Sequence, residues 1–210
     1  MAEIAFKHAR GVVYRATTYD TCLWVSPNSR PGRWNDPQAG AICQYCTLDV
    51  ASALAEMVRS ENLREVEDAR ELSISVWELR VDEGAVVDYS TPVSAQSQGF
   101  EWGALVSDNW APCQAEAGKL VAEGARGVLA PSAALPQGVT LTLFGPRTEI
   151  AWSVEPSLSI QIPARHILRG APGDGLVRDT RFFDQAYPDV TPRSAQSLFN
   201  LDLNVERRVS

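Results

Sequence analysis

The chain has 210 residues, of which 45% are hydrophobic, so it can build one sizeable core but hardly two full domains. Its 19 basic and 26 acidic side chains give a net charge of -7, which argues against a nucleic-acid backbone or an anionic membrane as the main partner. The sequence shows no signal-peptide pattern and no apolar run near the roughly 18 residues of a membrane span. We therefore expect a single-domain cytoplasmic protein without direct nucleic-acid or membrane contact.

The first predicted element is a strand at Val12–Ala16 (VVYRA), which is rich in β-branched and aromatic residues and carries Arg15. A guanidinium in a buried strand needs a partner, because leaving it unpaired in a core is very costly. That partner is either a nearby carboxylate or a bound anion, and the sequence leaves both open.

A loop follows at Ser26–Gly40, where Pro, Gly, Asn and Ser are too dense for regular structure. It carries Arg30, Arg33 and Trp34. Two guanidiniums and an indole suit a flat, negatively charged, aromatic ligand such as a dinucleotide. The alternative is that Trp34 pins the loop down and the arginines face solvent.

The next element is a strand at Ala41–Cys46, which carries Tyr45 as either a core aromatic or a platform for a ligand. Cys43 and Cys46 form a CxxC in this strand, but the alternation of a strand sends them to opposite faces. No second CxxC or nearby histidine completes a metal site. With only four scattered cysteines in the chain, we expect reduced thiols and no metal.

A helix is predicted to begin near Asp49 and to pack inward through one stripe of residues: Val50, Leu54, Met57 and Val58. Glu56 falls on the other side, where Ser52, Ala53 and Ser60 are small and would leave its carboxylate open. Taken alone, such a glutamate is most often merely solvated.

The rest of the chain alternates short strands with loops and one further helix. Strands are expected at Ser73–Val81, Val86–Tyr89, Gly127–Ala130, Thr140–Phe144, Ala151–Val154 and Ser157–Ile162. Ser90–Gly103 reads as a loop, and Ser107–Glu123 as a helix capped by Asp108 or Asn109. Ser132 lies where a strand ends, and its hydroxyl either bonds local backbone or belongs to a site.

Several common catalytic patterns are missing. The sequence has no HExxH, GxGxxG or P-loop, and only His8 and His166 are available for histidine chemistry. Redox, kinase and histidine-metal chemistry therefore lack support. The polar residues left for a site are arginine, tyrosine, glutamate and serine.

These residues occur in an order that resembles a known family. The order resembles that of the RES domain. It consists of Arg15 in YRA, Arg33 in PGRWN, Tyr45 on a strand, Glu56 at the end of ALAE, and Ser132 in GVLAPSA followed by an LTLF strand. That family is the toxin half of bacterial toxin-antitoxin pairs whose antitoxin is an Xre-type helix-turn-helix protein. Cys46-Thr47 departs from the family pattern, which has an apolar residue and a serine after the tyrosine.

The resemblance implies an α+β, ADP-ribosyltransferase-like fold, in which a split mixed sheet with flanking helices forms an NAD cleft. NAD would be the substrate, and no metal would be needed. The implied catalytic residues are Glu56, Arg33, Tyr45 and Ser132, and Arg15 would join Arg33, Tyr45 and Ser132 in binding NAD. Glu56 would stabilise the oxocarbenium-like state formed when the nicotinamide-ribose bond breaks.

The implied function is a toxin that cleaves NAD and is neutralised by its antitoxin. An ADP-ribosyltransferase that modifies a protein and a catalytically silent binding module are the alternatives. We expect residues 1–165 to form the RES domain. The tail at residues 166–210 would pack on this domain, on a second copy in a homodimer or on the antitoxin.

Overall fold

The computed structural model of the chain describes residues 4–18, 22, 31–37, 42–61, 73–146, 152–163 and 204–205. Its strands are β1 (Phe6–Thr17), β2 (Cys43–Thr47), β3 (Ser73–Asp88), β4 (Gly127–Pro131), β5 (Val139–Phe144), β6 (Trp152–Pro163) and β7 (Asn204–Val205). Its helices are α1 (Val50–Ser60), α2 (Pro92–Ser97), α3 (Trp102–Val106) and α4 (Ala111–Ala122). The described residues therefore form an α+β domain.

The described strands form one mixed sheet in the order β6-β3-β4-β5-β2-β1-β7. The long strand β3 also pairs with β1, so β1, β2, β5, β4 and β3 close into a ring. Among the described strand pairs, only β3 and β4 run parallel. The observed sheet therefore differs from the expected split sheet. The reason is the length of β3, which pairs with β1 along one edge and with both β6 and β4 along the other.

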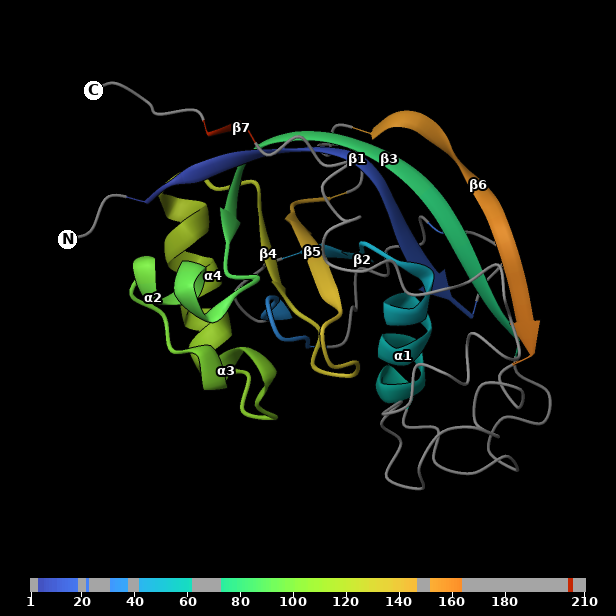
Figure 1. Cartoon of the computed structure of the whole chain (residues 1–210), viewed down its shortest axis with the longest axis horizontal. Coiled ribbons are helices and arrows are strands. Elements are labelled where there is room, and N and C mark those ends of the chain that lie inside the picture. The colour runs from blue at the N-terminus through green and yellow to red at the C-terminus, as the bar shows by residue number, and fades with distance from the viewer. Residues whose placement is uncertain are drawn as a thin grey trace.

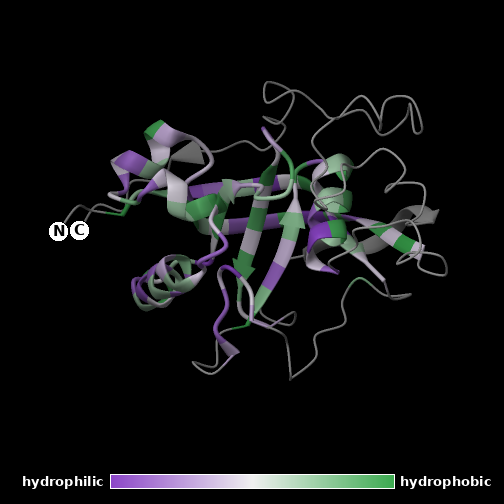
Figure 2. Ribbon diagram, turned by 90° about the horizontal axis from the view of Figure 1, so that it is seen from below, coloured by the Kyte–Doolittle hydropathy of each residue, from purple (hydrophilic) through white to green (hydrophobic). Residues whose placement is uncertain are grey.

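The helices cover the two ends of this sheet. Figure 1 shows α1 on one side of the short strands β2, β4 and β5 and the group α2–α4 on the other, beneath the arch of β1, β3 and β6. The view from below shows the same arrangement, with hydrophobic residues along the central strands (Figure 2). None of the described helices is long and apolar enough to cross a membrane.

Two hydrophobic clusters follow from strand alternation. One lies inside the ring and draws on all five of its strands, with Val13, Cys46, Leu79, Leu129 and Leu141 among its members. The other lies between the outside of the ring and the α2–α4 group. It includes Trp34, Tyr89, Leu105, Leu120 and Val128.

Several boundaries differ from the sequence-based expectations. The two strands expected around Asp82-Glu83-Gly84 are one, β3, which continues through a register shift opposite Lys7 and Ala9 with Ala85 at φ 53°. The expected break at Pro156 is also absent, and β6 is a single strand. Because β6 lies at the edge of the sheet, its proline is tolerated there.

The prediction of a loop at Ser90–Gly103 is wrong. The Thr91 hydroxyl caps α2 by accepting a hydrogen bond from the backbone N–H of Ser94. The Ser94 hydroxyl accepts one from the backbone N–H of Thr91, which completes a capping box, and Pro92 lies in the first turn. Helix α4 begins at Ala111, later than a cap at Asp108 would place it. Asp108 is thereby left outside the helix.

Little of the C-terminal tail is described. Its residues Asn204 and Val205 pair with His8 and Lys7 of β1 in the same chain. The tail aromatics Phe182, Phe183 and Phe199 lie outside the described residues.

Candidate functional site

The sheet topology brings the start of α1 next to the loop between β4 and β5. Strands β2 and β5 run antiparallel, so the end of β2 lies beside the start of β5, with Thr47 opposite Thr140. The N–H of Leu48 then donates to the carbonyl of Val139 at 3.1 Å. Since α1 follows only two residues later, its first turns face the β4–β5 loop.

Asp49 fixes where α1 begins. Its carboxylate accepts hydrogen bonds from the backbone N–H and the hydroxyl of Ser52, both at 2.7 Å, which is the usual N-cap arrangement. Burial raises the pKa of Asp49 despite these bonds. The expected start of the helix is therefore confirmed, and Glu56 follows two turns later.

The β4–β5 loop is folded tightly against this helix. The N–H of Gly138 donates to the carbonyl of Leu135 at 3.0 Å, with Pro136 and the positive φ of Gln137 (68°) between them, as in a type II turn. The N–H of Ser132 donates to the carbonyl of Gly138 at 2.8 Å and closes the loop. Ser132 is therefore held at a fixed position.

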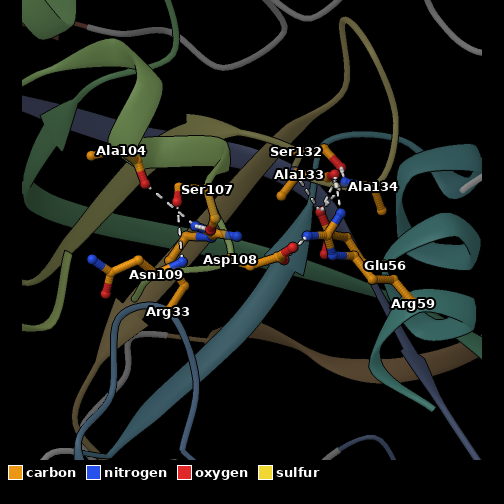
Figure 3. Close-up of polar contacts among 10 residues, drawn as sticks. All are labelled: Arg33, Glu56, Arg59, Ala104, Ser107, Asp108, Asn109, Ser132, Ala133 and Ala134. Atoms are coloured by element: carbon orange, nitrogen blue, oxygen red, sulfur yellow. Dashed lines mark hydrogen bonds and ion pairs between the residues drawn. The ribbon is translucent and has the colours of Figure 1, made fainter. Parts of the chain in front are cut away.

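Glu56 and Ser132 are in direct contact (Figure 3). The Ser132 hydroxyl donates to Oε1 of Glu56 at 2.5 Å, and the backbone N–H groups of Ala133 and Ala134 donate to the same oxygen at 3.0 and 3.3 Å. The hydroxyl oxygen of Ser132 in turn accepts from the N–H groups of Ala134 and Leu135. Among the described residues, no donor contacts Oε2 of Glu56.

The surroundings of Glu56 differ from those expected. Ser52 and Ala53 are buried, so they pack against the domain and do not leave an open face beside the carboxylate. Only Ser60 is exposed as anticipated. The small residues of α1 allow the helix to approach the β4–β5 loop closely, and this is why Glu56 is half-buried and hydrogen-bonded.

Arg59 joins the same loop and was not singled out from the sequence. Its Nη1 donates to the carbonyl of Ala133 at 2.6 Å, and its Nη2 contacts Oδ1 of Asp108 at 2.5 Å. Residues three apart share a helix face, so the spacing from Glu56 to Arg59 was the available signal. Asp108 carried no such signal, because it comes from a distant segment.

Arg33 lies on the other side of Asp108 (Figure 3). Its Nη1 donates to the carbonyls of Ser107 at 2.6 Å and Ala104 at 3.4 Å. The segment Ser107–Asp108 therefore contacts Arg33 through its backbone and Arg59 through its side chain. The structure thus places Arg33 and Glu56 on two sides of one segment.

Tyr45 holds the Arg33 loop in place. Its hydroxyl donates to Oδ1 of Asn35 at 2.8 Å and accepts from the backbone N–H of Trp34 at 2.9 Å. Burial raises the pKa of Tyr45, so the phenol stays protonated. A side chain on Gly32 would collide with Asn35 and the Tyr45 hydroxyl, so only glycine fits there.

Trp34 is the anchor of this loop and is not presented to a ligand. Its indole is 1% exposed and stacks on Tyr89, with ring centroids 6.0 Å apart and planes at 10°. This favours the alternative in which Trp34 pins the loop. Arg30 lies outside the described residues.

Arg15 is not joined to the other four predicted residues by a contact among the described residues. Its guanidinium donates to the side-chain carbonyl of Gln44, which is fully buried. Gln44 and Tyr45 are adjacent in β2 and so point to opposite faces of the sheet. Arg15 therefore lies on the ring side and has an amide rather than a carboxylate as its partner.

The two thiols of β2, Cys43 and Cys46, are poor nucleophiles. Burial raises the pKa of Cys43 to about 12 and that of Cys46 to about 11, so both stay protonated at neutral pH. Cys43 donates to the carbonyl of Trp34 at 3.3 Å and supports the loop.

Comparisons with known proteins identify the family of this chain. The crystal structure of the M. tuberculosis MbcT-MbcA toxin-antitoxin complex contains a similar chain, with a TM-score of 0.60 and 21% sequence identity over 80% of this chain and 93% of that chain. No curated protein matches the sequence significantly. The RES domain model matches residues 8–164, well over half of the chain. The chain therefore belongs to the RES domain family.

Proposed function

We propose that this protein is the toxin of a toxin-antitoxin pair and that it binds NAD and cleaves the nicotinamide-ribose bond. One observation carries the proposal: Ser132, Ala133 and Ala134 all bond Oε1 of Glu56, and no donor in the described part of the chain bonds Oε2. A fixed carboxylate with one oxygen left for a substrate is the group that this chemistry requires. Membership of the RES family and the toxin-antitoxin assembly of the similar structure support it.

The chemistry follows from the charge of the reacting centre. When the bond between nicotinamide and ribose breaks, its electron pair leaves with the nicotinamide nitrogen and positive charge develops on the ribose ring. Oε2 of Glu56 would stabilise that charge electrostatically and hydrogen-bond the ribose. Neutral nicotinamide is a good leaving group, so no general acid is needed. Water or phosphate then adds to the ribose carbon and loses a proton.

The other residues bind and position the substrate in this proposal. Arg33 would hold the diphosphate through the part of its guanidinium that Ser107, Ala104 and Cys113 do not use. Ser132 orients Glu56 and does not act as a nucleophile. Tyr45 acts indirectly, since its hydroxyl is committed to Trp34 and Asn35 and fixes the Arg33 loop. Arg15 would act only from the opposite face of β2, where it bonds Gln44.

Purified protein incubated with NAD tests the proposal. Nicotinamide release by the protein alone, with or without phosphate, supports hydrolysis or phosphorolysis. Release or labelling that requires cell extract indicates an ADP-ribosyltransferase. If no release and no labelling occur, the protein is a silent binding module.

In cells, expression should arrest growth, and an Xre-type helix-turn-helix partner should relieve the arrest. Harmless expression of a protein that binds NAD would contradict the toxin assignment.

Arg33→Lys should weaken NAD binding by about tenfold or more, because a lysine cannot reproduce the planar fork that bonds carbonyls and phosphate at once. Calorimetry with a non-cleaved ligand such as ADP-ribose measures this effect. Arg80→Lys is the matched control, since Arg80 is exposed on β3. Equal affinities for both variants would show that Arg33 only braces the Ser107 carbonyl.

A further inference from the structure

The pair between Arg59 and Asp108 is unequal in its surroundings. Only 26% of the Arg59 side chain is exposed, whereas 92% of the Asp108 side chain is exposed. Arg59 is also anchored by its bond to the carbonyl of Ala133, which Asp108 does not share. The guanidinium of Arg59 is therefore held in place by Ala133 as well as by Asp108, and the exposed carboxylate of Asp108 is the more weakly fixed member of the pair.

Arg59 bonds the backbone of Ala133, which is one of the residues that hold Glu56. The N–H of Ala133 donates to Glu56 at 3.0 Å, and the carbonyl of the same residue accepts from Arg59 at 2.6 Å. Both side chains come from one face of α1. A ligand whose sugar contacts Oε2 of Glu56 would therefore lie near the guanidinium of Arg59, because Glu56 and Arg59 bond the same residue, Ala133.

The contact with Asp108 is easily exchanged. The Asp108 side chain is almost fully exposed, and an ion pair that is open to water contributes little to stability, because water screens it and the side chains lose freedom. A diphosphate carries more charge than a carboxylate and accepts the guanidinium fork equally well. Such a ligand would displace Asp108 without disturbing the bond from Arg59 to Ala133.

We propose that Arg59 is a second diphosphate-binding residue of the site and that Asp108 occupies its guanidinium as a competing carboxylate until a dinucleotide displaces it. This inference rests on the proposed function and names the part of the substrate that Arg59 would hold. Arg33 and Arg59 then flank the segment Ser107–Asp108 from opposite sides and would share the diphosphate (Figure 3). Asp108 would lower substrate affinity and so raise the NAD concentration at which the protein acts.

Two substitutions with opposite expected signs test the proposal. Asp108→Asn should tighten binding of ADP-ribose by about two- to fivefold, because the competing charge is removed. Arg59→Gln should weaken it by about tenfold or more, because a charge-assisted bond is lost. Both are measured by calorimetry, with Glu123→Gln and Arg80→Gln as controls that remove the same charges at exposed positions, Glu123 at the end of α4 and Arg80 on β3.

The opposite signs separate competition from a structural role. If the ion pair only braced the fold, both variants would weaken binding, and that result or an unchanged Asp108→Asn would overturn the proposal. Arg59→Lys covers the case in which Arg59→Gln unfolds, since it keeps the charge and should bind with intermediate affinity. Nicotinamide release by the wild-type protein is followed in parallel. If release persists while the signs fail, the inference alone is wrong; if the wild type neither releases nicotinamide nor binds ADP-ribose, both are wrong.

Discussion

Glu56→Gln should reduce the rate of nicotinamide release at saturating NAD by about a hundredfold or more, while the protein remains folded. The loss is that of a charge placed where positive charge develops on the ribose, which is typical of removing one electrostatic contact to a transition state. The amide oxygen of glutamine still accepts the bonds that Ser132, Ala133 and Ala134 now donate to Oε1. Binding of ADP-ribose should therefore change far less than turnover.

Single-turnover measurements of nicotinamide release, with thermal melts of the same samples, check this result. Glu61→Gln is the matched control, because Glu61 ends the same helix, is exposed and should leave both rate and melting temperature unchanged. A Glu56→Gln protein that cleaves NAD at the wild-type rate would refute the catalytic assignment. A variant that loses its melting transition would instead show that the carboxylate is needed to hold the β4–β5 loop.

Gly138→Ala should lower the free energy of unfolding by about 1–3 kcal/mol, as overpacking of a tight contact does. The added methyl carbon would lie 2.4 Å from the Ser52 hydroxyl, 3.0 Å from Cβ of Ser132 and 3.1 Å from the Leu135 carbonyl. Ser52 cannot turn aside without losing its bond to Asp49. The loop must therefore move away from α1 and carry Ser132 from Glu56.

Urea unfolding and the rate of nicotinamide release measure both consequences, and we expect the rate to fall together with the stability. Gly118→Ala is the control, because it lies on the exposed side of α4 and its added carbon would meet no atom within 4 Å. That substitution should stabilise the protein by about 0.5–1 kcal/mol through helix propensity. Gly138→Ala at wild-type stability would mean that α1 and the loop are packed less closely than the distances indicate.

The order of chemical residues along the chain was readable from the sequence because it depends on local pattern. The period of 3.6 residues after Asp49 predicted helix α1, and short strand-like runs predicted β2, β4 and β5 close to their observed positions but only Val12–Ala16 of the longer strand β1. The ordered set from Arg15 to Ser132 was enough to recognise the family. Strand ends were less accurate, because a bulge at Ala85 and an edge proline resemble turns in sequence.

What surrounds these residues was decided only by tertiary structure. The contact between Glu56 and Ser132 spans 76 positions and exists because β2 and β5 are antiparallel neighbours, a pairing that local periodicity does not encode. The same is true of Asp108, which reaches Arg59 only because it lies outside α4. Tyr45 and Trp34 were recognised by residue type, but burial and hydrogen bonding made them supports of the Arg33 loop. Side-chain chemistry is a local property of the chain, whereas burial and partners depend on which distant segments the fold brings together.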